Sequence, residues 1–111
     1  MHILLIEDNP EDQHLYKTYL SMDREYDYTF SVSQTGEEGL SLYRKERFDC
    51  IILDYNLPDM DGIEFLDTLA HISQPLKAPV IFLTGQGDEM VAVEAMKKGV
   101  YDYLVKSKVN S

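Results

Sequence analysis

Short apolar runs alternate along this chain with longer segments whose apolar residues recur at helical spacing. Four runs lead directly into polar residues: 3–6 into Glu7 and Asp8, 48–53 into Asp54, 80–83 into Thr84, and 103–105 into Lys106. A fifth run, residues 28–32, is rich in aromatic and β-branched side chains and is also typical of a strand. Strict alternation of strand and helix favours right-handed crossovers and a parallel sheet. The pattern therefore predicts an α/β, flavodoxin-like, doubly wound fold with five parallel strands in the order 2-1-3-4-5.

The polar residues at the strand ends are expected to form one site. The carboxyl ends of parallel strands share an edge of the sheet, where open α/β folds bind ligands. In the predicted order the first and third strands are neighbours, so Glu7 and Asp8 come next to Asp54. Crowded carboxylates raise one another's proton affinity or recruit a cation. Mg²⁺ is the expected cation because it prefers oxygen ligands, whereas the three histidines are scattered over different elements and do not predict a zinc site.

The same group of residues suits phosphoryl transfer. A carboxylate such as Asp54 can accept a phosphoryl group to give an aspartyl phosphate. The transfer depends mainly on positioning and on neutralisation of charge, which Mg²⁺ and a lysine supply. Lys106 would pair with one phosphoryl oxygen, and the Thr84 hydroxyl would donate to another. Asn56, two residues past Asp54, can offer its backbone carbonyl to the metal ion.

Each of these residues also has an ordinary structural interpretation. A strand-end aspartate such as Asp54 is more often a turn or helix cap than a nucleophile. Glu7 and Asp8 could be favourable charges at a helix N-terminus. Thr84 could be a local cap, and Lys106 a surface charge. The functional interpretation is favoured because all of them occur together at the ends of alternating strands.

Helix boundaries follow from capping residues. Asn9 can cap a helix whose first residue is Pro10, residues 35–38 form a capping box, and Gly99 is a favourable residue just after a helix. The apolar residues predicted to recur along the helices are Leu15, Tyr16, Tyr19, Leu20, Leu40, Leu42, Tyr43, Ile63, Leu66, Leu69, Ala70, Val91, Ala95 and Met96.

Composition bounds the class of protein. A length of 111 residues predicts one domain, residues 1–111, and no apolar run approaches the roughly 20 residues of a membrane span. No signal peptide is expected, and Cys50, the only cysteine, is expected to be a small buried apolar residue, so a reducing, cytoplasmic setting fits. The formal net charge of −10 argues against nucleic-acid binding.

These residues closely resemble the receiver domain of two-component response regulators, including the single-domain chemotaxis type. The resemblance spans nearly the whole chain, from residues 3–9 to residues 103–106, and residues 53–62 look like the family's phosphorylation loop. It implies that Asp54 takes phosphate from a phosphohistidine on a sensor histidine kinase or a phosphotransfer protein. It also implies that Asp8 and Asp54 are direct Mg²⁺ ligands.

The resemblance assigns the remaining site residues as well. Glu7 and Asp8 look like the family's acidic pair, and Asn56 would give a backbone carbonyl to the metal. Thr84 and Tyr103 resemble the family's switch pair: on phosphorylation the hydroxyl moves toward the phosphoryl group and the aromatic ring turns inward. The added charge and acceptor oxygens give this movement a physical cause.

The chain departs from the family pattern in two places. The family usually has proline after the lysine, preceded by a cis peptide bond, whereas Ser107 follows Lys106 here. A non-proline cis bond costs about 2.5–4 kcal/mol, which makes a trans bond plausible. Only five residues follow Lys106, too few for the family's last helix, so the domain is expected to be short at its C-terminus. We expect a homodimer contact, a downstream protein or further sequence to cover the apolar sheet surface left bare.

Four functions remain in competition. The first is a phosphoacceptor signalling module that catalyses only its own phosphorylation and dephosphorylation. An aspartyl phosphatase would carry a second acid two residues after Asp54, where Asn56 stands. A flavin mononucleotide carrier of this fold would need a phosphate loop where Glu7 and Asp8 would repel phosphate. The fourth is a degenerate receiver that acts as a protein-interaction module without phosphorylation.

Overall fold

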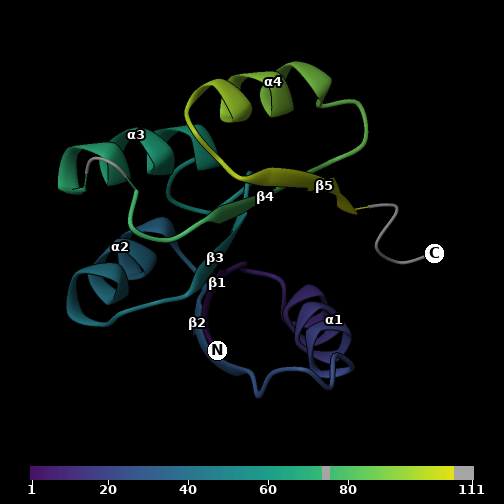
Figure 1. The fold of residues 1–111 in the computed structure, drawn as a ribbon. Coiled ribbons are helices and arrows are strands. Elements are labelled where there is room, and N and C mark those ends of the chain that lie inside the picture. Colours follow the sequence, from purple (N-terminus) through teal and green to yellow (C-terminus); the bar gives the residue numbers. More distant parts are fainter. Residues whose placement is uncertain (74–75, 107–111) are drawn as a thin grey trace.

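The computed structural model describes residues 1–73 and 76–106, which form one parallel sheet flanked by helices (Figure 1). The strands lie in the order β2-β1-β3-β4-β5, as the sequence predicts. In chain order the elements are β1 (His2–Ile6), α1 (Pro10–Ser21), β2 (Thr29–Ser33), α2 (Gly36–Lys45), β3 (Cys50–Asp54), α3 (Gly62–Ile72), β4 (Val80–Thr84), α4 (Glu89–Lys97) and β5 (Asp102–Val105). The prediction of a flavodoxin-like α/β fold is confirmed.

The central strands bury both of their faces. On β1, Leu4 and Ile6 pack into a core with α2, α3 and α4, whereas Ile3 and Leu5 pack into a second core with α1. Alternate residues of a strand point to opposite faces, so a strand covered on both sides is apolar at every position. Figure 1 shows α1 on the side of the sheet opposite the other helices.

The strand register aligns the polar residues at the carboxyl edge. Ile6 pairs with Leu53, so the next residues along the two strands, Glu7 and Asp54, lie level with each other. On the other side Asp54 pairs with Leu83, and Thr84 pairs with Val105. The register therefore places the residues that end β1, β3, β4 and β5 along one edge.

The residues predicted to cap the helices lie at helix ends. The Asn9 side chain accepts hydrogen bonds from the N–H groups of Glu11 and Asp12, and Pro10 is the first residue of α1. The Thr35 hydroxyl accepts a hydrogen bond of 3.1 Å from the N–H of Glu38 at the start of α2. Gly99 follows α4 with a φ of 96°, a conformation that glycine adopts without strain.

Three details differ from the sequence-based predictions. The second strand begins at Thr29, whose N–H bonds to the carbonyl of Met1; Tyr28 instead donates its hydroxyl to Asp23. Tyr19 and Met96 share the spacing of the buried helical residues but are exposed. Helical spacing identifies a face of the helix, but it does not show how far the neighbouring elements cover that face.

An open apolar groove of about 550 Å³ lies on the α1 side of the sheet, between α1 and β5. It is lined by Met1, Ile3, Tyr16, Tyr19, Leu20, Tyr28, Cys50, Ile52, Ile81, Leu83, Asp102 and Leu104. Cys50 is half-buried there, and burial raises the pKa of its thiol. Four helices occur in the described residues, and the groove is the uncovered sheet surface expected from the sequence.

Two further observations bear on the sequence-based expectations. Within residues 1–73 and 76–106 no helix is both long enough and apolar enough to cross a membrane. The peptide bond between Lys106 and Ser107 lies outside the described residues.

Candidate functional site at the carboxyl edge of the sheet

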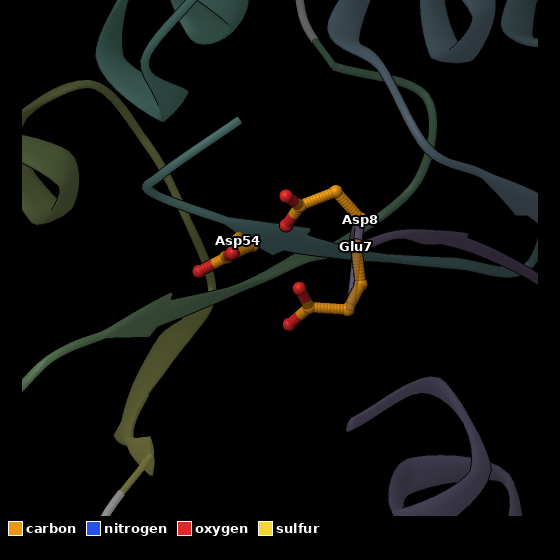
Figure 2. A group of neighbouring side chains, drawn as sticks. All are labelled: Glu7, Asp8 and Asp54. Carbon is orange, nitrogen blue, oxygen red and sulfur yellow. The ribbon is translucent and has the colours of Figure 1, made fainter. Parts of the chain in front are cut away.

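Three carboxylates meet where β1 and β3 end. One carboxylate oxygen from each of Glu7, Asp8 and Asp54 lies within 4.8 Å of the others. Figure 2 shows Glu7 and Asp8 extending from the end of β1 toward Asp54 on β3. Glu7 and Asp54 are only 0% and 2% exposed, whereas Asp8 is exposed. Solvent therefore reaches the cluster at Asp8, whereas Glu7 and Asp54 are shielded from it.

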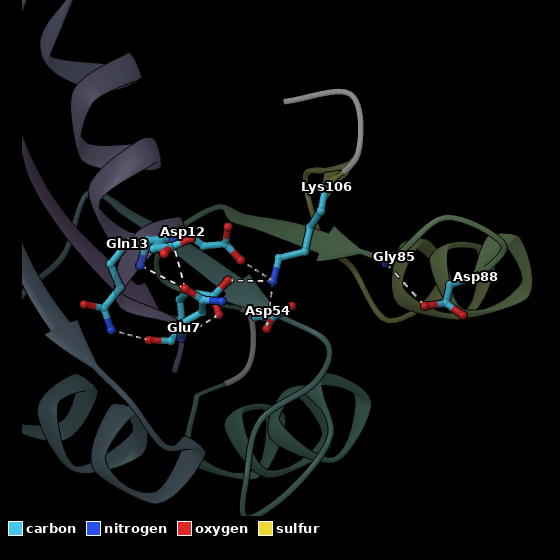
Figure 3. Close-up of polar contacts among 9 residues, drawn as sticks. Glu7, Asp12, Gln13, Asp54, Gly85, Asp88 and Lys106 are labelled. Carbon is cyan, nitrogen blue, oxygen red and sulfur yellow. Dashed lines mark hydrogen bonds and ion pairs between the residues drawn. The ribbon is translucent and has the colours of Figure 1, made fainter. Parts of the chain in front are cut away.

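Lys106 neutralises part of this negative charge. Its Nζ lies 2.8 Å from Glu7 Oε1 and 3.3 Å from Asp54 Oδ2 (Figure 3). Burial by itself lowers the pKa of Lys106, but the contact with Glu7 and the charge of Asp54 outweigh burial and raise the pKa above its usual value. Lys106 is therefore fully protonated at neutral pH.

Burial acts on the two buried acids in the opposite sense. Burial, helped by the nearby charge of Asp54, raises the pKa of Glu7 to about 7 despite the lowering effect of the Lys106 ammonium. Burial also raises the pKa of Asp54, which Lys106 and the N–H of Asn56 partly oppose. A carboxyl with a pKa near 7 is about half protonated at neutral pH, so the charge of Glu7 changes in this pH range.

The donor set fits a hard divalent cation. All three side chains offer carboxylate oxygens, the ligands that Mg²⁺ prefers. Glu7 Oε1 is buried and has no hydrogen-bond partner among the described residues; its contact with Lys106 is an ion pair without hydrogen-bond geometry. A buried oxygen of this kind usually has a partner, such as water or an ion.

The loop after β3 is held by contacts within itself and by hydrogen bonds from α2. The N–H of Gly62 bonds to the carbonyl of Tyr55 at 2.7 Å, and Asn56 pairs with Asp61 in an isolated antiparallel bridge. The Asp59 carboxylate accepts 2.8 and 2.9 Å hydrogen bonds from the first two N–H groups of α2. Asn56 is therefore held in a constrained loop, next to Asp54 in space and two residues from it in sequence.

Thr84 and Tyr103 lie on neighbouring strands in different environments. Thr84 ends β4 and is buried, one residue beyond the partner of Asp54 in the sheet. Tyr103 lies on β5 opposite Phe82 and is 41% exposed. The Tyr103 side chain thus lies outside the packed core in this structure.

Two residues at the site were not predicted from the sequence. Asp12 Oδ2 lies 3.1 Å from Lys106 Nζ, and the Gln13 side chain donates a 2.6 Å hydrogen bond to the Glu7 carbonyl (Figure 3). Both lie in the first turns of α1, directly after the Asn9 cap. The position of the predicted helix start next to Glu7 was the available signal, because it brings the first turn over the carboxyl edge of β1.

Comparison with known proteins identifies the family. Residues 3–110 match the model of the response regulator receiver domain. The transcriptional regulatory protein SrrA of Staphylococcus aureus is 36% identical over 104 residues, which cover 94% of this chain but 41% of SrrA. The chain thus spans about two fifths of this curated relative's length.

Solved structures agree with this assignment. The Mn²⁺-bound response regulator Rcp1 is 28% identical with a TM-score of 0.83, covering 95% of this chain and 80% of that one. The phosphorylated cyanobacterial phytochrome response regulator RcpA has the same identity and TM-score, covering 95% of this chain and 79% of that one. The chain belongs to the family of receiver domains of two-component response regulators.

Proposed function

We propose that this receiver domain is a phosphoacceptor of a two-component phosphorelay and that Asp54 carries the phosphoryl group. The observation that carries the proposal is the buried Asp54 carboxylate, 3.3 Å from the Lys106 ammonium and clustered with two further acids. The expected donor is a phosphohistidine on a sensor histidine kinase or a histidine phosphotransfer protein. A receiver of this kind modifies itself and does not turn over a metabolite.

The transfer balances as a displacement at phosphorus. An Asp54 oxygen forms a bond to phosphorus as the phosphorus–nitrogen bond of the phosphohistidine breaks, and the imidazole leaves with the electron pair and takes up a proton. Lys106 would hold one transferring oxygen, and the Thr84 hydroxyl would donate to another. Attack of water on the resulting aspartyl phosphate regenerates the carboxylate and releases inorganic phosphate.

Glu7, Asp8 and Asp54, with the backbone carbonyl of Asn56, are the residues that would hold Mg²⁺. The three carboxylates within 4.8 Å support this assignment, as does the Mn²⁺-bound form of the related Rcp1. Bound Mg²⁺ would supply charge neutralisation for the transferred group. Glu7 must then give up the proton that it holds near neutral pH.

We expect Mg²⁺ to stabilise the domain by mass action, by about 2.7 kcal/mol at a concentration 100 times its dissociation constant. Because the pKa of Glu7 is about 7, apparent affinity should rise as pH increases from 6 to 8, with protons released on binding. Melting temperatures in a Mg²⁺ titration at both pH values measure this. Glu11→Gln should keep the shift, since Glu11 is exposed outside the cluster, whereas Asp8→Asn should weaken it. A wild-type melting temperature that does not change with Mg²⁺ would contradict the proposed metal site.

The switch proposed for Thr84 and Tyr103 starts from a buried hydroxyl and an exposed ring. A phosphoryl group on Asp54 would attract the hydroxyl, and the vacated space would admit the ring. Photo-CIDNP NMR reports the accessibility of tyrosine rings. Loss of the Tyr103 signal on phosphorylation would support the switch, and an unchanged signal would contradict it.

For the apolar groove between α1 and β5, we propose that a second copy of the chain or a downstream protein covers it. The exposed Leu104 and the apolar lining support this assignment. Sedimentation equilibrium of the wild type and of Leu104→Asp tests the homodimer. A dimeric wild type and a monomeric variant would support it, whereas a monomeric wild type would favour a downstream protein as the partner. The net charge of −10 supports protein partners over nucleic acid, and a cytoplasmic location fits.

Phosphoramidate, whose phosphorus–nitrogen bond imitates phosphohistidine, provides the experimental test. After incubation with Mg²⁺, borohydride reduction converts an aspartyl phosphate to homoserine, and peptide mass spectrometry locates the changed residue. Conversion at position 54 would support the proposal. A properly folded chain without any conversion would favour the alternative, a degenerate receiver that acts only as a protein-interaction module.

A further inference from the structure

Lys106 has a third carboxylate partner besides Glu7 and Asp54. Its Nζ lies 3.1 Å from Asp12 Oδ2, closer than to Asp54 Oδ2 at 3.3 Å. Asp12 comes from α1 and not from the sheet edge, and Figure 3 shows it reaching the ammonium from a different direction than Asp54. The lysine that the proposed transfer needs is therefore already held by a residue outside the acidic cluster.

The position of Asp12 is held by its own helix. The Asn9 side chain accepts the N–H of Asp12 at 3.3 Å, and the Asn9 carbonyl accepts the N–H of Gln13 at 2.9 Å. Gln13 in turn bonds to the Glu7 carbonyl at 2.6 Å. The first turn of α1 is thus fastened to the end of β1, and the Asp12 carboxylate is presented to Lys106 from a fixed base.

Three carboxylates surround the Lys106 ammonium. Three carboxylate oxygens lie within 3.3 Å of Nζ: the ammonium donates a hydrogen bond to Asp54 and forms ion pairs with Glu7 and Asp12. A phosphoryl group on Asp54 must therefore compete with the negative charges of Glu7 and Asp12 for the ammonium. The Asp12 side chain is 25% exposed, against 0% for Glu7 and 3% for Asp54. Asp12 is therefore the partner that water can most readily take over.

We propose that Asp12 restrains phosphorylation by competing with the phosphoryl group for Lys106. The inference rests on the proposed phosphoacceptor function. Asp12 acts through Lys106 and is a positioning residue: its carboxylate attracts the ammonium and so weakens the hold of Lys106 on the transferring group. Removal of that charge frees the ammonium for the phosphoryl group, so Asp12→Asn should accelerate phosphorylation of Asp54. A residue that merely aims Lys106 at Asp54 would have the opposite effect.

The test compares initial rates of phosphorylation by phosphoramidate in saturating Mg²⁺ for wild type, Asp12→Asn and Glu11→Gln. We expect Asp12→Asn to be about two- to fivefold faster, the range for loss of one partly exposed ion pair. Glu11→Gln removes the same charge from the same turn, but Glu11 forms no ion pair in the described residues, so its rate should match wild type. An Asp12→Asn rate equal to or below wild type overturns the proposal.

A double-mutant cycle separates competition for Lys106 from simple repulsion of the anionic donor. In a Lys106→Met background the Asp12→Asn change should have no effect on the rate, because no ammonium remains to be released. An acceleration that persists without Lys106 would mean that Asp12 acts on the donor directly, which overturns the proposal.

Failure of the proposed function gives a different result. A wild type that takes no phosphoryl group refutes phosphoacceptance, but the competition can still be measured with beryllium trifluoride, which imitates a phosphoryl group on a carboxylate. Followed by ¹⁹F NMR in Mg²⁺, it should bind Asp12→Asn about two- to fivefold more tightly than wild type. Equal affinities, or no binding to either protein, overturn the proposal.

Discussion

At pH 8 without divalent cations, we expect Asp54→Asn to raise the free energy of unfolding by about 1–2 kcal/mol. Asp54 is 2% exposed, and burial raises its pKa despite the nearby Lys106. An acid whose pKa is raised in the folded state contributes stability below its unfolded pKa and loses it as pH rises. The amide keeps the shape of the side chain, removes the buried charge and leaves Glu7 as the main partner of Lys106.

Urea unfolding at pH 8 and pH 5 measures this effect. The gain should shrink at pH 5, where the acids take up protons and the wild type no longer carries the full crowded charge. Glu11→Gln controls for the general benefit of removing one negative charge from a chain of net charge −10, and should change stability little. An Asp54→Asn variant no more stable than wild type at pH 8 would contradict the view that this site is destabilised by its own acids.

Lys106→Met should have the opposite and larger effect, lowering stability at pH 8 by about 2–3 kcal/mol. Breaking a fully buried ion pair costs about 3–5 kcal/mol, and the 26% exposure of the Lys106 side chain reduces that figure. Without the ammonium, the buried carboxylates of Glu7 and Asp54 have no cationic partner among the described residues. Only an added cation could then compensate their charge.

The pH dependence identifies the cause of this loss. The pKa of Glu7, about 7 in the wild type, should rise further once Lys106 is removed. At pH 6 Glu7 is then neutral and needs no cation, so part of the loss should disappear, and the loss should also shrink at pH 8 when Mg²⁺ is added. Lys98→Met, which removes the exposed pair with Asp67, is the matched control and should lack this pH dependence. An equal loss at both pH values would instead indicate that the lysine stem contributes packing.

Much of this structure could be predicted from the sequence, because the connections between strands follow a fixed handedness and the polar residues at strand ends are easy to identify. Alternation of strand and helix dictates parallel pairing, and the order of the sheet then brings Glu7 and Asp8 to Asp54. The starts of α1 and α2 could be predicted from their capping residues, because the side chains of Asn9 and Thr35 accept N–H groups that the first turn of every helix leaves without a partner.

The errors and omissions came from contacts between distant residues. Asp12 resembles an ordinary acid in a helix first turn, and its pairing with Lys106 depends on how α1 meets the end of β5. Tyr19 has the spacing of a core residue, but it borders the groove between α1 and β5 and stays exposed. Tertiary coverage of a helix face cannot be read from its periodicity.

The most direct test of phosphoacceptance at Asp54 is the intact mass of the chain after incubation with acetyl phosphate and Mg²⁺. Wild type and Asp54→Asn should be weighed side by side, with a chelator-treated wild type as a third sample. We expect the wild type alone to gain the mass of one phosphoryl group, and to lose the gain when Mg²⁺ is chelated before the donor is added. An equal gain in Asp54→Asn, or no gain in a folded, Mg²⁺-binding wild type, would contradict the assignment of Asp54 as the phosphoacceptor.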